Sequence, residues 1–179
     1  MLAPTLLAEL RQEFPAFRVE YKRRSPLNHA IHVLLCVVTL GGQRGYLTEF
    51  YTVIGDTLYV PDSWDTLDDV GRVILLRHER VHLRQRRRYG TLGMTFLYLV
   101  PFFPLGLAYF RAKLEWEAYT ETLRATAELR GLAAARDPGL RARLIRRFTG
   151  PAYGWMWPFR RRVESWYEAA LAEIARSAP

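Results

Sequence analysis

Two histidines and a glutamate lie within one helical turn of each other in the segment His78-Glu79-Arg80-Val81-His82. In an α-helix, residues four positions apart share a face, so both imidazoles can reach one ion. Neutral imidazole binds Zn²⁺ readily. The carboxylate of Glu79 would then reach a water on the ion and act on its protons as a general base. The pattern predicts a zinc site at His78 and His82 with Glu79 as the base.

The context of this pentapeptide favours a site over a coincidence. The same five-residue pattern also occurs by chance, and the alternative is two surface histidines on a charged helix. Here the motif lies within a predicted long helix that follows a predicted β-hairpin, and the apolar run Val73–Leu76 precedes it. We therefore prefer the zinc site.

A catalytic zinc site needs a third protein ligand and one open position. The four histidines of the chain are His29, His32, His78 and His82, and none follows His82. The third ligand must therefore be a carboxylate or must come from upstream. We interpret His29 and His32, three positions apart on an apolar segment, as ordinary core or surface histidines rather than a second metal site.

Acidic residues recur in the later segment Glu115-Trp-Glu117-Ala-Tyr119-Thr-Glu121. At this point the chain resembles the gluzincins, zinc peptidases with H-E-x-x-H on one helix and a glutamate ligand on a later one. Several gluzincin-like families carry Glu-x-x-Ala with the first glutamate on the metal, which implies Glu115 as the third ligand. Glu117 and Glu121 are the alternatives, because their spacing matches another gluzincin pattern. Position 119 is tyrosine, where those families have aspartate or asparagine.

The resemblance covers roughly residues 46–122 and implies a zinc metallopeptidase that hydrolyses peptide bonds of a peptide or protein substrate. In minimal gluzincins a small sheet precedes the active-site helix, and a strand near the cleft can pair with an extended substrate. We expect one α+β domain over residues 1–179, dominated by helices and with a small antiparallel sheet. A helical and aromatic extension is expected at about 138–179.

The expected elements follow from periodicity and from turn residues. We expect helices at 4–13, 26–41, about 63–89, 111–132 and 160–176, a strand at 17–24, and a hairpin over 46–61 that turns at Gly55-Asp56. Ser63 or Asp65 is expected to cap the long helix, and Gly90 is expected to end it. With no later histidine, Tyr119, Tyr153 or an arginine must stabilise a developing oxyanion, if any residue does.

The length of 179 residues fits one domain, and the single cysteine, Cys36, cannot form an internal disulfide. Cys36 is expected to be a buried structural thiol. The first residues lack a basic leader and a long apolar core, so they do not resemble a signal peptide, and we expect a cytoplasmic protein.

The formal net charge of +8 comes almost entirely from arginine, with clusters at Arg84–Arg88, Arg141–Arg147 and Arg160–Arg162. Such clusters attract nucleic acid or anionic lipid. We interpret them mainly as solvated surface, since no recognised nucleic-acid-binding motif accompanies them. The alternative function is a non-catalytic protein that keeps the zinc fold and binds nucleic acid or an anionic membrane surface through these arginines.

The segment 91–110 is nearly long enough and apolar enough to span a bilayer. A full span would place His82 and Glu115 on opposite sides, where they could not share one ion. We therefore expect a core-filling or re-entrant connection, broken at Pro101 and Pro104. A peripheral membrane contact through Arg84–Arg88 and Phe96–Phe103 is a second expectation; a membrane protein with an accidental motif is the remaining alternative.

Overall fold

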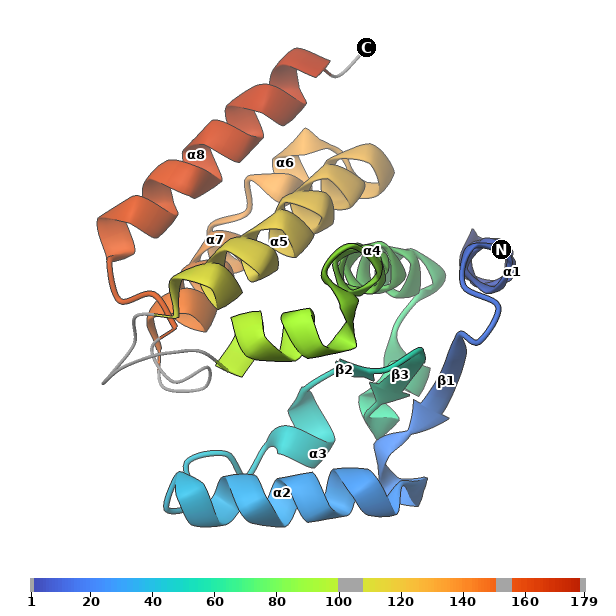
Figure 1. The fold of residues 1–179 in the computed structure, drawn as a ribbon. Coiled ribbons are helices and arrows are strands. Elements are labelled where there is room, and N and C mark those ends of the chain that lie inside the picture. The colour runs from blue at the N-terminus through green and yellow to red at the C-terminus, as the bar shows by residue number, and fades with distance from the viewer. Residues whose placement is uncertain (1, 100–107, 151–155, 178–179) are drawn as a thin grey trace. The chain divides into compact units, whose positions relative to one another are not determined.

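The computed structural model of the chain describes residues 2–99, 108–150 and 156–177. It confirms an α+β architecture that is dominated by helices and contains one small three-stranded sheet (Figure 1). The chain forms two compact units, residues 1–83 and 84–179, and the boundary falls inside the long helix α4, Asp69–Leu99. The expectation of a single domain over 1–179 stays a prediction.

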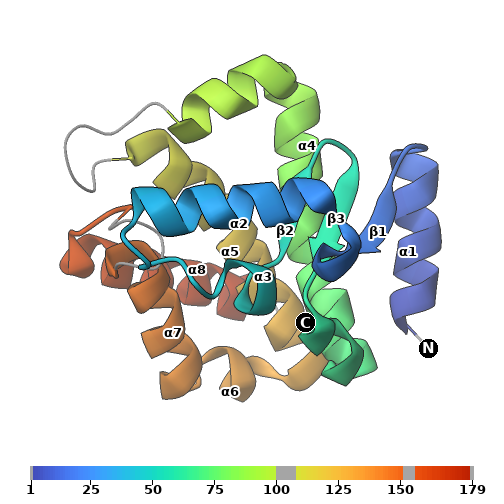
Figure 2. The same ribbon diagram turned by 90° about the horizontal axis from the view of Figure 1, so that it is seen from below.

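The first unit contains the sheet and the helices that precede α4. Its elements are α1 (Leu2–Glu13), β1 (Arg18–Tyr21), the 3₁₀ helix η1 (Lys22–Arg24), α2 (Pro26–Val38), α3 (Tyr46–Glu49), β2 (Thr52–Ile54), β3 (Thr57–Val60) and the 3₁₀ helix η2 (Asp62–Thr66). The short helix α3 lies between α2 and the sheet (Figure 1), and Figure 2 shows α2 from below.

The sheet has the order β1-β3-β2, with the fully buried Leu58 and Val60 on the central strand. β2 and β3 pair antiparallel around the predicted turn, where Gly55 adopts a φ of +61°. β1 instead pairs parallel with β3, so the sheet is mixed rather than antiparallel throughout as expected. The connection through α2 and α3 leads from β1 into β2, and the hairpin turn then reverses the chain, so that β3 runs in the direction of β1.

Two local expectations are wrong. Residues 46–49, expected to open a strand, form α3, because the N–H groups of Thr48 and Glu49 donate to the carbonyl of Gly45. Ser63 and Asp65, expected to cap the long helix, lie in η2 instead. The side chain of Asp68 accepts the N–H of Gly71 at 2.8 Å, and thereby performs the expected capping role three to five residues later in the chain.

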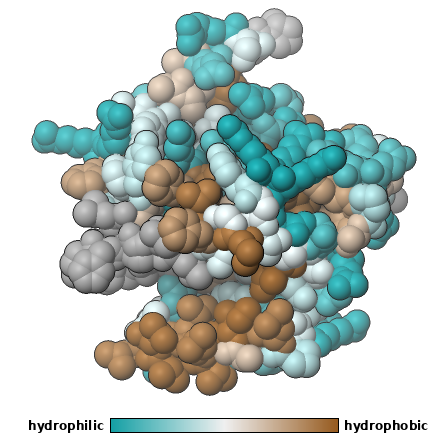
Figure 3. Space-filling model, viewed as in Figure 1, coloured by the Kyte–Doolittle hydropathy of each residue, from teal (hydrophilic) through white to brown (hydrophobic). Residues whose placement is uncertain are grey.

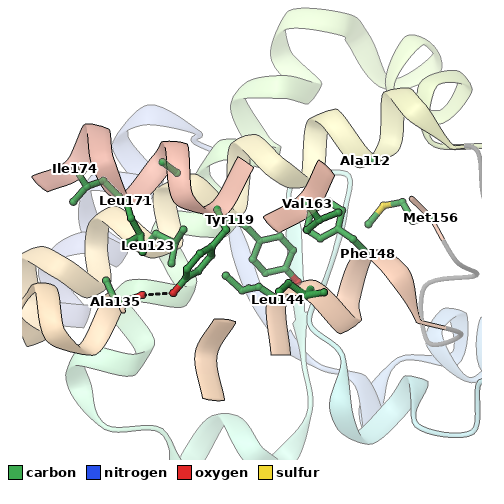
Figure 4. Close-up of a cluster of buried hydrophobic side chains, with 13 residues drawn as sticks. Ala112, Tyr119, Leu123, Ala135, Leu144, Phe148, Met156, Val163, Leu171 and Ile174 are labelled. Carbon is green, nitrogen blue, oxygen red and sulfur yellow. Dashed lines mark hydrogen bonds between the residues drawn. The ribbon is translucent and has the colours of Figure 1, made fainter. Parts of the chain in front are cut away.

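The second unit contains the rest of α4 and the helices α5 (Tyr109–Arg130), α6 (Leu132–Ala135), α7 (Pro138–Thr149) and α8 (Arg160–Ser177). The buried side chains of α5 to α8 form one core, in which the rings of Tyr119 and Phe148 lie next to each other (Figure 4). The hydroxyl of Tyr167 donates to the carbonyl of Ala135 at 2.7 Å, so that its polar end is satisfied inside this core.

Gly90 interrupts α4 with φ +72° and ψ 165°, which confirms the predicted end of the first helical segment. Helical structure then resumes and runs to Leu99, whereas the predicted breaks at Pro101 and Pro104 lie outside the described residues. Within the described ranges, no helix has both the length and the apolar character that a membrane crossing requires.

Candidate metal centre

The helix α4 presents the predicted motif in regular helical geometry. Leu76, Glu79 and Leu83 follow one another at intervals of three and four residues and are all buried. They form the inward face of the helix, so Glu79 is a carboxylate held among apolar neighbours on its own helix. Because His78 and His82 are offset from these positions, the two imidazoles lie beside this buried face.

The imidazoles of His78 and His82 converge on one point. Their Nε2 atoms lie 3.2 Å apart, and the ring centroids are separated by 4.9 Å. Two nitrogen ligands on a tetrahedral Zn²⁺ lie about 3.3 Å apart, given Zn–N bonds of roughly 2.0–2.1 Å. The same separation suits an N–H···N hydrogen bond between two neutral rings. A metal between the rings requires an unprotonated Nε2 on both of them, whereas the hydrogen bond requires one on the accepting ring only.

Gln85, one turn after His82 on α4, links the same face of this helix to α5. Its buried side-chain Nε2 donates to the carbonyl of Leu114 and to the carboxylate of Glu117, both at 2.9 Å. Positions 78, 82 and 85 share a helical face by their spacing. The hydrogen bonds of Gln85 therefore connect this part of α4 to the turn of α5 that contains Leu114 and Glu117.

Glu115 completes a group of three ligand side chains. One ligand atom each from His78, His82 and Glu115 can be chosen so that all lie within 4.8 Å of one another. Glu115 is buried, with 6% of its surface exposed, whereas Glu117 is largely exposed and bound to Gln85. Glu121 pairs with Arg124 at 3.0 Å. Of the three acidic candidates on α5, Glu115 alone joins this group within the described residues.

Two histidines and one carboxylate suit a catalytic zinc site. They offer two imidazole nitrogens and one carboxylate oxygen, all of which bind zinc in proteins, and leave one coordination position for water or substrate. The donor set and the separation of the imidazole nitrogens thus both fit a zinc ion. Glu79 follows the first of these ligands in the chain and does not belong to the group itself.

A buried lysine lies within electrostatic reach of Glu79. Lys22, from η1, is fully buried and donates to the carbonyl of Tyr46 at 2.8 Å and to Oγ1 of Thr52 at 2.9 Å. Its Nζ also lies 3.6 Å from the centre of the Tyr46 ring. Burial lowers the pKa of Lys22 to about 7, and the charge of Glu79 acts in the opposite direction and raises it.

Lys22 could not have been recognised from the sequence. It opens the run Lys22-Arg23-Arg24, which resembles solvated surface, and the side chains of Arg23 and Arg24 are indeed exposed. Only the fold of η1 turns Lys22 inward, beneath Tyr46. A positive charge at this point offsets part of the unfavourable burial of the Glu79 carboxylate.

The other histidines lie outside this group. His29 Nε2 lies 3.1 Å from the carbonyl oxygen of Arg23, and the ring of His32 lies 3.8 Å from the sulfur of Cys36. Neither forms a metal-ligand group with other described residues. Cys36 is half-buried rather than buried as expected, because α2 carries it at the edge of an exposed face.

The expected oxyanion donors differ in their surroundings. Tyr119 is buried, and its ring packs edge-on against Phe148 at 5.6 Å between centroids. Its position in the core agrees with the packing role of a buried aromatic ring. Tyr153 lies outside the described residues.

Several of the arginines that suggested a binding patch form ion pairs within the chain. Arg141 pairs with Glu164 and Glu168, and Arg160 pairs with Glu164. Such pairs use part of the charge that a nucleic-acid interface would need for phosphates. The interpretation of these two clusters as solvated surface stays a prediction.

Comparisons with models of protein families, with curated proteins and with solved structures found no match for this chain.

Proposed function

We propose that the chain is a zinc-dependent peptide hydrolase, in which His78, His82 and Glu115 hold the ion and Glu79 is the general base. The observation that carries this proposal is the convergence of these three ligand side chains from two helices. The spacing of the motif accounts for two of them, but a chance motif gives no reason for a buried glutamate to meet them.

The chemistry divides between the ion and the chain. When bound, zinc polarises the substrate carbonyl and lowers the pKa of a water molecule. Glu79 takes a proton from the attacking water as its oxygen bonds to the carbonyl carbon. The carbon–nitrogen bond then breaks, and Glu79 returns the proton to the departing amine. Water is thereby added across the peptide bond, and the carboxylate of Glu79 is regenerated.

The surroundings of Glu79 support this role. A base must be ionised to accept a proton, and burial among apolar residues disfavours the ionised carboxylate. The nearby Lys22 supplies a compensating positive charge when it is protonated. Lys22 is thus a positioning residue for the base in this proposal.

Cleavage of a peptide library by the wild-type chain and by Glu79→Gln tests the proposal. The substitution keeps the size of the side chain and removes its ability to accept the proton. We expect cleavage by the wild type, loss of at least about a hundredfold in rate for Glu79→Gln, and unchanged zinc content. Equal cleavage by both proteins would show that Glu79 is not the base, and binding without cleavage would favour the non-catalytic alternative.

A further inference from the structure

The helix α2 turns an apolar face to solvent. We call this the α2 outer face; its members are about half or more exposed, with fractions of 49% for Leu27, 60% for Val33, 61% for Leu34, 67% for Val37, 71% for Val38 and 95% for Leu40 just beyond the helix. Figure 3 shows a hydrophobic, brown surface at the bottom of the view, where Figure 1 places α2. Contiguous exposed apolar surface of this kind marks an interaction site.

The opposite face of α2 is held by polar contacts. Asn28 is fully buried, accepts the hydroxyl of Tyr46 at 2.8 Å, and donates from its side chain to Ser25 Oγ at 3.0 Å. Ser25 also caps the helix, and Pro26 occupies its first turn. α2 is therefore fixed in place with its apolar side outward, which reverses the usual pattern of a surface helix.

The charged residues that flank α2 most closely in the sequence are arginines. From Tyr21 to Thr48 the sequence contains no aspartate or glutamate, whereas exposed Arg24 precedes α2 and exposed Arg44 follows it. An open hollow of about 360 Å³ on this side of α2 is lined mainly by Val33, Val37 and Leu40, together with His32, Cys36, Gly41 and Arg44. An apolar wall that ends in a cation matches the acyl chain and the anionic headgroup of a lipid.

A second copy of the chain fits this surface less well. In a symmetric dimer the same face meets itself, so that arginines at the two ends of α2 would face arginines in either helix orientation. A helix of 13 residues is about 20 Å long, too short to cross a hydrocarbon core of about 30 Å. A helix with these properties is suited to lie in the plane of a membrane surface.

We propose that the α2 outer face docks the protein on an anionic lipid surface, with the apolar side chains at the acyl boundary and with Arg24 and Arg44 at the headgroups. This inference does not depend on the proposed hydrolase activity. It also differs from the contact expected at Arg84–Arg88, because it involves another helix.

The test is sedimentation with phosphatidylcholine vesicles that contain or lack phosphatidylglycerol. We expect binding to the anionic vesicles and a loss of at least about tenfold in affinity for Val33→Ser with Val37→Ser. Arg24→Gln with Arg44→Gln should weaken binding to the anionic vesicles and reduce its salt dependence. Circular dichroism of each variant checks that the exposed substitutions leave the fold intact.

The matched control is Leu92→Ser with Phe96→Ser, an exposed apolar pair at the same spacing on α4, after the Arg84–Arg88 cluster. This control should retain affinity to within about twofold. Loss of binding in the control but not in the α2 pair would overturn the proposal, as would an absence of binding to anionic vesicles. Concentration-dependent dimers that Val33→Ser with Val37→Ser abolishes would also overturn it, because a second copy would then cover the face.

Discussion

At the scale of single residues, α5 separates three chemically similar carboxylates by their positions on one helix. Glu115 is buried and joins the two histidines, Glu117 binds Gln85, and Glu121 pairs with Arg124. Offsets of two residues turn side chains about 200° around a helix axis, so neighbouring glutamates cannot serve the same ion equally well. The identity of the third ligand is therefore a question that two isosteric substitutions can answer.

We predict that Glu115→Gln weakens zinc binding by more than the roughly 10–100-fold that is typical of losing a ligand's hydrogen-bond partner. Glu117→Gln should change the affinity by only a few-fold, because its amide can still accept from Gln85. Competition titrations with a chromophoric chelator measure both constants. A larger effect of Glu117→Gln than of Glu115→Gln would exchange the roles of the two residues.

A second prediction concerns Lys22 and pH. In the folded chain the pKa of Lys22 is about 7, against 10.5 for an ordinary lysine in the unfolded chain. Between these values the unfolded state holds more protons, so the contribution of Lys22 to stability rises with pH, by up to about 1.4 kcal/mol per pH unit. Below pH 7 both states are protonated, and the unfavourable burial of the charge is present in full.

The measurement is urea unfolding of the metal-free wild type and of Lys22→Met between about pH 7 and about pH 10. The wild type should gain stability relative to the variant as the pH rises, because methionine removes the titration but fills similar space. If the two stability curves run parallel, Lys22 keeps an ordinary pKa in the folded chain.

At the scale of elements, α4 is the part of the molecule that sequence periodicity predicted best. Its apolar spacing, its motif and its interruption at Gly90 could all be predicted from the sequence, because the helical period and the backbone freedom of glycine are local properties. The helical structure of α3 could not be predicted from the sequence, since Tyr46 and Thr48 favoured a strand. Hydrogen bonds to the carbonyl of Gly45 prevailed over that preference.

Gly90 gives a third prediction. Its φ of +72° with ψ of 165° belongs to a region that is essentially restricted to glycine. Gly90→Ala should lower the free energy of unfolding by about 1–3 kcal/mol, although an added Cβ would meet no atom within 4 Å. The cause would then be backbone strain alone.

The matched control is Gly93→Ala, three residues later in helical structure. Among the described residues, an added Cβ there meets the Cβ of Tyr89 alone, at an ordinary 3.6 Å. Alanine should therefore stabilise the chain by up to about 1 kcal/mol, since it favours a helix over glycine. Chemical denaturation of both variants is the measurement. Equal effects of the two substitutions would show that Gly90 does not need its unusual conformation.

At the scale of the whole molecule, the motif and the resemblance to gluzincins predicted the residues that the structure brings together. His78 and His82 followed from helical spacing, and Glu115 from a short pattern on a later helix. The buried environment of Glu79 could not be predicted from the sequence, because it depends on Lys22, which lies some sixty positions earlier in the chain. Long-range burial is set by tertiary packing rather than by local preference.

A fourth prediction concerns the folded state as a whole. A ligand that binds only the folded chain stabilises it, so zinc should raise the melting temperature and a chelator should lower it. Thermal unfolding with and without zinc measures the shift, and Glu115→Gln should reduce it. An equal shift in the variant would place the ion elsewhere.

The central claim is that His78, His82 and Glu115 hold one zinc ion. Elemental analysis of untagged protein, purified without chelator, tests it most directly, with His82→Ala analysed alongside. We predict about one zinc per wild-type chain and almost none in the variant, since loss of one of three protein ligands removes tight binding. Well-folded wild-type protein that holds no zinc, even after zinc is offered, would contradict the account.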